Sequence, residues 1–221
     1  AVIHWVGGSS TQFNNPANWS PPQVPGAGDD VVIDLAGAVT VNSPVSTTVN
    51  SLSLIATATL TIAGGTTFTV NNGTNGAGVA GTLVIPNNAV LSIGGSIVNS
   101  GTIFESSTGT ATQIRLTQTH TTLTGGGKIV LSPNTNNQIY GALGTFELEN
   151  VDNTIIGAGN IGNGQMVLTN GGVINANDPT AALTINTAGN VIRNTGTMEA
   201  TLGGDLNILS PVNHEIGRAH V

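Results

Sequence analysis

Pairs of apolar residues, separated by one position, recur along this chain at a fixed interval of about 23 residues. The pair Leu60 and Ile62 returns as Leu83 and Ile85. The same step links Phe68/Val70 to Leu91/Ile93 and then to Ile114/Leu116, and it links Leu183/Ile185 to Leu206/Ile208. Each pair has the period of two that is typical of a strand with one buried face. Strands that recur at a fixed interval predict a solenoid, in which each repeat is one coil stacked on the last.

A polar element repeats with nearly the same period. The segment NGGVINA at 170–176 returns as NTGTMEA at 194–200, a step that is one position longer than that of the apolar pairs. Recurrence of similar residues at one phase favours parallel stacking, because each side chain then meets its equivalent in the next coil. The alternative fold, an antiparallel β-sandwich, needs no equal spacing between its strands.

The composition argues against helices. Charged residues make up 7% of the 221 residues and glycine contributes 31, while the candidate strands are rich in valine, isoleucine, leucine and threonine. Glycine and β-branched residues lower helix propensity, and β-branched residues suit a pleated surface. We therefore predict an all-β fold, a right-handed parallel β-helix (a β-solenoid) over residues 31–214. The repeat length gives about eight coils in this range. A strand spacing of about 4.8 Å then gives a rod roughly 40 Å long.

The charge balance excludes some partners. The net charge is −7, with only four Lys and Arg residues, so the chain lacks the clustered cations that neutralise nucleic-acid phosphates. There is no cysteine, which excludes disulfides and thiolate metal sites. No apolar stretch approaches the roughly 18 residues that a membrane-spanning helix needs, so we expect no such helix.

The first 30 residues differ from the rest and hold three of the seven aromatic residues, Trp5, Phe13 and Trp19. Four prolines at positions 16, 21, 22 and 25 interrupt any extended strand. We predict that residues 1–30 form an aromatic cap over the first coil, because the end of a stack exposes unpaired backbone groups.

The last residues carry a different signal. Residues 216–221, IGRAHV, match the translation of ATCGGAAGAGCACACGTC, which resembles a common sequencing-library adapter, and Glu215 would share the junction codon. We expect residues 215–221 to be an artefact and the natural protein to continue. An uncapped last coil would present an open edge, so we also expect end-to-end self-association through it.

Several segments resemble a known group of proteins. They are HWVGG at 4–8, NWS at 18–20, PGAGDDVVI at 25–33 and, most specifically, NVDNTIIGAGNIGNG at 150–164. These segments resemble the β-helical repeat regions of large bacterial surface proteins, the autotransporter-like and filamentous-haemagglutinin-like adhesins. The resemblance implies an exported, extracellular protein at the bacterial cell surface, associated with the outer membrane in its full-length form. It implies adhesion or a stalk role, with host or surface glycans or proteins as partners, and no catalytic site.

The best candidate for chemistry is an acidic cluster. Glu147 and Glu149 share one face of an expected strand at 145–148 and its extension, and Asp152 follows. Polysaccharide lyases and hydrolases on β-helices need several carboxylates on one face. We interpret this cluster as an outward-facing edge that keeps the rod soluble. We expect Asp29 and Asp30 to cap turns after a glycine, with cation binding as the alternative.

The remaining candidates do not form a motif. His4, His120 and His214 lack ligand spacing, and in a solenoid we expect such distant residues not to meet. We expect Arg115 and Arg193 to point outward. The two tryptophans could form a sugar-stacking platform, but we expect them to be buried.

The sequence thus predicts a non-enzymatic structural or adhesive β-helix, a piece of a large secreted or surface-displayed protein. We predict no catalytic, cofactor-binding or metal-binding residues. The alternatives are a carbohydrate-active β-helix enzyme and a carbohydrate-binding module. The residues that we expect to point inward are Leu60, Ile62, Leu83, Ile85, Leu91, Ile93, Leu183, Ile185, Leu206 and Ile208.

Overall fold

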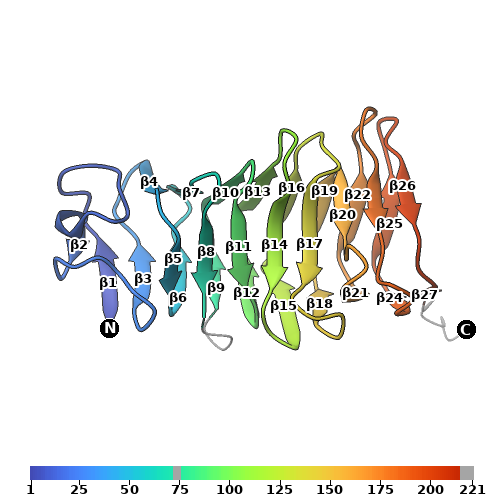
Figure 1. Cartoon of the computed structure of the whole chain (residues 1–221), viewed down its shortest axis with the longest axis horizontal. Coiled ribbons are helices and arrows are strands. Elements are labelled where there is room, and N and C mark those ends of the chain that lie inside the picture. The colour runs from blue at the N-terminus through green and yellow to red at the C-terminus, as the bar shows by residue number, and fades with distance from the viewer. Residues whose placement is uncertain (72–75, 215–221) are drawn as a thin grey trace, which may run out of the picture.

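The computed structural model describes residues 1–71 and 76–214 and shows a β-solenoid. Figure 1 shows the strands stacked side by side along one axis, with β1 and β27 at opposite ends of the rod. The chain runs repeatedly through three sheets, named here A, B and C, which have 11, 8 and 8 strands. The eight strands of sheets B and C confirm the prediction of about eight coils.

Sheet A contains the first strands of the chain and every third strand after them. It consists, in spatial order, of β2 (Trp19–Ser20), β1 (Val2–Trp5), β3 (Asp30–Ile33), β6 (Ser51–Leu54), β9 (Ala77–Val79), β12 (Ser96–Asn99), β15 (His120–Thr124), β18 (Glu147–Asn150), β21 (Val167–Asn170), β24 (Ile192–Asn194) and β27 (Val212–His214).

Sheets B and C each take one strand from every coil. Sheet B consists of β4 (Val39–Ser43), β7 (Ala58–Ile62), β10 (Thr82–Pro86), β13 (Thr102–Ser106), β16 (Lys128–Leu131), β19 (Thr154–Gly157), β22 (Val173–Ala176) and β25 (Thr197–Ala200). Sheet C consists of β5 (Thr47–Val49), β8 (Thr67–Val70), β11 (Val90–Ile93), β14 (Thr112–Leu116), β17 (Asn137–Gly141), β20 (Gly159–Ile161), β23 (Leu183–Ile185) and β26 (Leu206–Ile208). The one helical element is the short 3-10 turn η1 (Pro16–Asn18) among the described residues.

The strand register confirms the repeats found in the sequence. Leu60 pairs with Leu83 across β7 and β10, and Leu183 pairs with Leu206 across β23 and β26. Asn170 pairs with Asn194 across β21 and β24. Every pairing in the three sheets is parallel except that of β1 with β2. The stack is therefore a solenoid and not the β-sandwich that was the alternative.

The coils differ in length although their strands stay in register. In sheet B the step from Leu83 to its neighbour Ile103 is shorter than the common repeat, and the next step, from Ile103 to Ile129, is longer. The extra residues lie in the corners between sheets. Coils of unequal length continue between residues 117 and 165. The strands β17, β19 and β20 of this stretch contain none of the repeated apolar pairs found in the sequence.

The core lies inside the three sheets and consists of stacked aliphatic side chains. Leu60, Leu83 and Ile103 form one such ladder, and all three are buried. Eight of the ten residues expected to point inward are buried, but Leu206 is only partly buried and Ile208 is 38% exposed. Both residues still lie in register with the inward-pointing Leu183 and Ile185. They are less buried because β26 is the terminal strand of sheet C and is flanked on one side only.

An aromatic cluster closes the N-terminal end, as the sequence predicted. Trp5 and Phe13 each lie edge-on to Trp19, with ring centroids 4.9 and 4.8 Å apart. Phe13 also meets Phe68 of β8, 5.6 Å away, which ties the cap to the core. The indole Nε1 of Trp19 donates a hydrogen bond to the carbonyl of Phe13. This antiparallel β1–β2 segment covers the end of sheet A, where parallel stacking begins.

Candidate functional site

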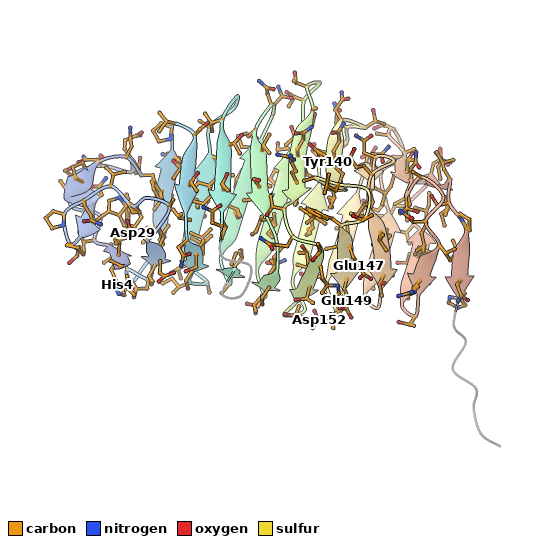
Figure 2. The ribbon with its side chains drawn as sticks, turned by 60° about the horizontal axis from the view of Figure 1, so that its bottom comes forward. His4, Asp29, Tyr140, Glu147, Glu149 and Asp152 are labelled. Atoms are coloured by element: carbon orange, nitrogen blue, oxygen red, sulfur yellow. The ribbon has the colours of Figure 1, made fainter. Side chains whose placement is uncertain are left out.

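The main group of ionisable side chains lies on the outer face of sheet A. His120 on β15 pairs in register with Glu147 on the next strand, β18. Its Nδ1 lies 3.0 Å from Oε2 of Glu147, and its Nε2 lies 3.0 Å from Oε2 of Glu149. Figure 2 shows the two glutamates on the same part of the rod. We call His120, Glu147 and Glu149 the imidazole–carboxylate cluster.

The surroundings of the cluster favour its charged form. The hydrogen bond to Glu147 is the main cause that raises the pKa of His120. Burial raises the pKa of Glu147, but the hydrogen bonds from Thr169 and His120 and the charge of Arg193 outweigh it and lower that pKa overall. An imidazole can donate to two carboxylates only when both nitrogens are protonated. With His120 in that form, the cluster is an ion-pair network in which one cation lies between two anions.

The cluster brings together residues that the sequence did not connect. The three candidate histidines lie apart on β1, β15 and β27, as expected, but His120 and Glu147 lie one coil apart and are neighbours in the sheet. His4 likewise lies 3.1 Å from a carboxylate oxygen of Asp34 at the other end of the rod. In both cases the histidine approaches acids rather than other histidines. In residues 1–71 and 76–214 no group of three or more His, Asp or Glu side chains is placed to hold a metal ion.

The third acid of the predicted group is not part of the cluster. Asp152 follows β18 and accepts hydrogen bonds from the backbone N–H groups of Gly125 and Gly126 in the corner of the preceding coil. The bond from Gly126 is the main cause that lowers the pKa of Asp152. This carboxylate therefore caps a turn rather than enlarging the cluster.

The predicted capping role is visible for Asp29 but not for Asp30, which bonds side chains of the next coil. Asp29 accepts a hydrogen bond from the backbone N–H of Gly26, which is the main cause that lowers its pKa. Asp30 accepts hydrogen bonds from the side chains of Ser51 and Asn50 in the next coil. Figure 2 shows Asp29 and His4 at the N-terminal end, far from the imidazole–carboxylate cluster.

The other predictions for single residues agree with the structure. Arg115 and Arg193 point outward and are exposed. The two tryptophans are 3% and 2% exposed, so they form core rather than a stacking platform for a sugar. In the part of the chain that the structure describes, we find no helix with the length and apolar character needed to cross a membrane.

The interior contains a ladder of buried asparagine side chains, and two of these asparagines belong to the polar segments that repeat in the sequence. The side-chain amide of Asn150 donates to Oδ1 of Asn170 at 2.9 Å, and that of Asn170 donates to Oδ1 of Asn194 at 2.8 Å. All three are buried where sheet A turns into sheet B. The amides also bond to backbone carbonyls in these corners. The ladder therefore fixes the corner geometry and the register of successive coils.

One buried acid escaped the sequence analysis. Glu105 on β13 has no exposed surface and points into the core, in register with Ile85 and Leu131. Its position was readable from the sequence, because it shares the period-two alternation of Ile103.

The comparisons with known proteins identify the family. A family model described as a domain of unknown function (DUF8693) matches residues 4–210. The chain belongs to this family. No curated protein and no solved structure matches the chain. The matched range includes the aromatic cap and nearly all of the described coils, so the DUF8693 domain corresponds to the cap and rod together.

Proposed function

We propose that this DUF8693 domain is a rigid, non-enzymatic spacer in a large secreted or surface-displayed bacterial protein, with adhesion as its context. The observation that carries the proposal is the unbroken register of three parallel sheets along the whole described rod. Each coil is joined to the next by backbone hydrogen bonds on three sides. Such a stack transmits force along its axis and holds its corner loops at fixed intervals.

The placement of the acids supports the same role. Asp152 and Asp29 cap turns, and Glu147 and Glu149 share one histidine. Each of these carboxylates therefore interacts with a hydrogen-bonding partner that belongs to the rod itself. The charges serve solubility and coil-to-coil attachment in this proposal.

A carbohydrate-active enzyme is the second candidate, and the imidazole–carboxylate cluster is the observation that favours it. It is the place on the rod where an imidazole and two carboxylates meet a solvent-exposed surface, with Thr169 and Arg193 beside them. General acid–base chemistry on a polysaccharide would use groups of this kind.

Two measurements test the spacer proposal. Small-angle scattering of the purified chain should report an elongated particle about 40–50 Å long, as strands about 4.8 Å apart require. A panel of acidic and neutral polysaccharides should show no formation of reducing ends or unsaturated products above a heat-denatured control. Turnover by the wild-type chain that is lost in His120→Gln, with the fold retained, would refute the spacer and establish the enzyme.

The cellular setting needs its own test. Antibodies raised against the chain should label intact cells of the source bacterium, and external protease should remove the signal. Labelling only after lysis would contradict surface display but would leave the mechanical role untouched.

A further inference from the structure

Glu105 is buried without a hydrogen-bonding partner. Both of its carboxyl oxygens lack a partner among the described residues, and its side chain has no exposed surface. Its neighbours in the same inward row of sheet B are Ile85 and Leu131, which are apolar and buried. An ionised carboxylate in such a place would lose its hydration without compensation, which strongly disfavours the charged form.

The charged groups on the neighbouring described strands face away from this carboxyl. Lys128 on β16 and Arg115 on β14 project from the outer faces of their sheets and are exposed. Tyr140 on β17 also lies at an outward position. Burial accordingly raises the pKa of Glu105 well above its usual range. The backbone N–H groups of Gln138 and Ile114 approach the carboxyl without hydrogen-bonding geometry, and they lower that pKa less than burial raises it.

A second unsatisfied group lies in the same coil. The side chain of Asn99 donates to Lys128 and Asn153, but its Oδ1 has no partner in the described part of the chain. The atom Oδ1 of Asn99 and the two carboxyl oxygens of Glu105 are the buried side-chain atoms left without partners among the described residues. All of them belong to residues 96–116, which we call the central coil and which comprises β12, β13 and β14.

We propose that the central coil is a proton-controlled opening point of the rod, closed while Glu105 is neutral and the first internal coil to open when Glu105 loses its proton. Opening would hydrate the carboxylate and relieve both unsatisfied groups. In a linear stack each coil contacts only its neighbours, so one weak coil can open while those on either side remain folded. The device lies in the middle of the rod and is independent of the proposed spacer role.

The direction of the pH effect follows from the raised pKa. Glu105 binds its proton more tightly in the closed coil than in the open coil. The closed coil therefore keeps its full stability at pH values below the ordinary glutamate pKa. Stability is then lost as the pH rises towards the raised pKa of the closed coil. Across that interval the open fraction should increase about tenfold for each pH unit, and above it the fraction should become constant.

Hydrogen exchange of the whole chain between pH 5 and pH 9, read by mass spectrometry and corrected for intrinsic rates, tests the proposal. Peptides from the central coil should lose protection with rising pH, whereas those from β7–β8 and β21–β23 should not. Glu105→Gln, which cannot ionise, should remove the pH dependence. Asp205→Asn, a change at an exposed position before β26, should leave it intact. The same pH trend in wild type and Glu105→Gln would overturn the proposal.

Infrared spectroscopy provides a readout that does not depend on opening. A protonated carboxyl band should persist in the wild-type chain at pH 7 and disappear in Glu105→Gln. If that variant fails to fold, Glu105→Leu, which matches the apolar row of Ile85 and Leu131, replaces it in both measurements. Absence of the protonated band at pH 7 in the wild type would refute a neutral Glu105.

Discussion

The asparagine ladder makes the sharpest energetic prediction. Asn170 is buried and accepts a hydrogen bond from Asn150, while its amide faces the carbonyl oxygens of Gly172 and Thr197 and Oδ1 of Asn194. Its two N–H groups and one accepting oxygen can therefore form about three hydrogen bonds at once. At about 1 kcal/mol net for each bond, Asn170→Ala should lower the free energy of unfolding by about 3 kcal/mol.

The matched control is Asn175→Ala, one strand further along the chain. Asn175 lies on the outer face of β22, where its side chain bonds Glu199 and Thr201 within reach of water. Its loss should cost about 0.5 kcal/mol or less. Asn170→Asp keeps the size of the side chain but removes the amide donors and buries an acid against acceptors, so it should destabilise the rod at least as much as Asn170→Ala.

Urea unfolding followed by far-UV circular dichroism measures all three variants against wild type, with the midpoint as the primary quantity because a linear stack need not unfold in two states. The reasoning fails if Asn170→Ala shifts the midpoint no more than Asn175→Ala. It also fails if Asn170→Asp is as stable as wild type, since the ladder would then not depend on amide donors.

Three further predictions concern the core, a corner and the surface. Leu83→Ala should destabilise the rod by about 2–5 kcal/mol in urea unfolding, because Leu83 is fully buried; a cost below about 1 kcal/mol would contradict the packing. Gly101→Ala should fail to fold or lower the melting temperature sharply, because a Cβ there would overlap the carbonyl of Gly81, whereas Gly144→Ala has open space and should melt like wild type. His120→Gln should lower the melting temperature slightly at pH 5 and less at pH 8. The raised pKa of His120 means that its stabilising contribution is present below the ordinary imidazole pKa and is lost as the pH rises through the folded value. Because the side chain is 50% exposed, the effect should be below about 1 kcal/mol, and an equal difference at both pH values would contradict the ion-pair assignment.

The fold was largely predictable from the sequence where coils have equal length. Leu60 and Leu83, which are one repeat apart in the sequence, are paired neighbours in sheet B. Phe68 and Leu91, separated by the same number of residues, are paired neighbours in sheet C. Prediction failed where corners lengthen, because the longer step hides the equivalence of Ile103 and Ile129. It also failed where glycines lie in strands. In the sequence Gly157 and Gly159 are typical of a loop, but in the structure they belong to β19 and β20, where both have positive φ values.

The candidate site was only half predictable. The alternation of Glu147 and Glu149 placed both on one outer face, and the structure confirms that placement. Their contact with His120 depends on the length of the intervening coil, which the sequence alone did not reveal. The burial of Glu105 follows from simple alternation along β13, but the lack of partners follows only from the packing of neighbouring coils.

The unequal coil lengths have a consequence for how such a chain can change. Neighbouring strands remain paired whether the coil between them is short, as from Leu83 to Ile103, or long, as from Ile103 to Ile129. A corner can therefore gain or lose residues without shifting any inward row. Insertions and deletions should accumulate in the corners, while inward positions vary only among side chains of similar shape. A peptide grafted into one corner of each coil would be presented at a regular pitch of about 4.8 Å along the rod, as on a ruler.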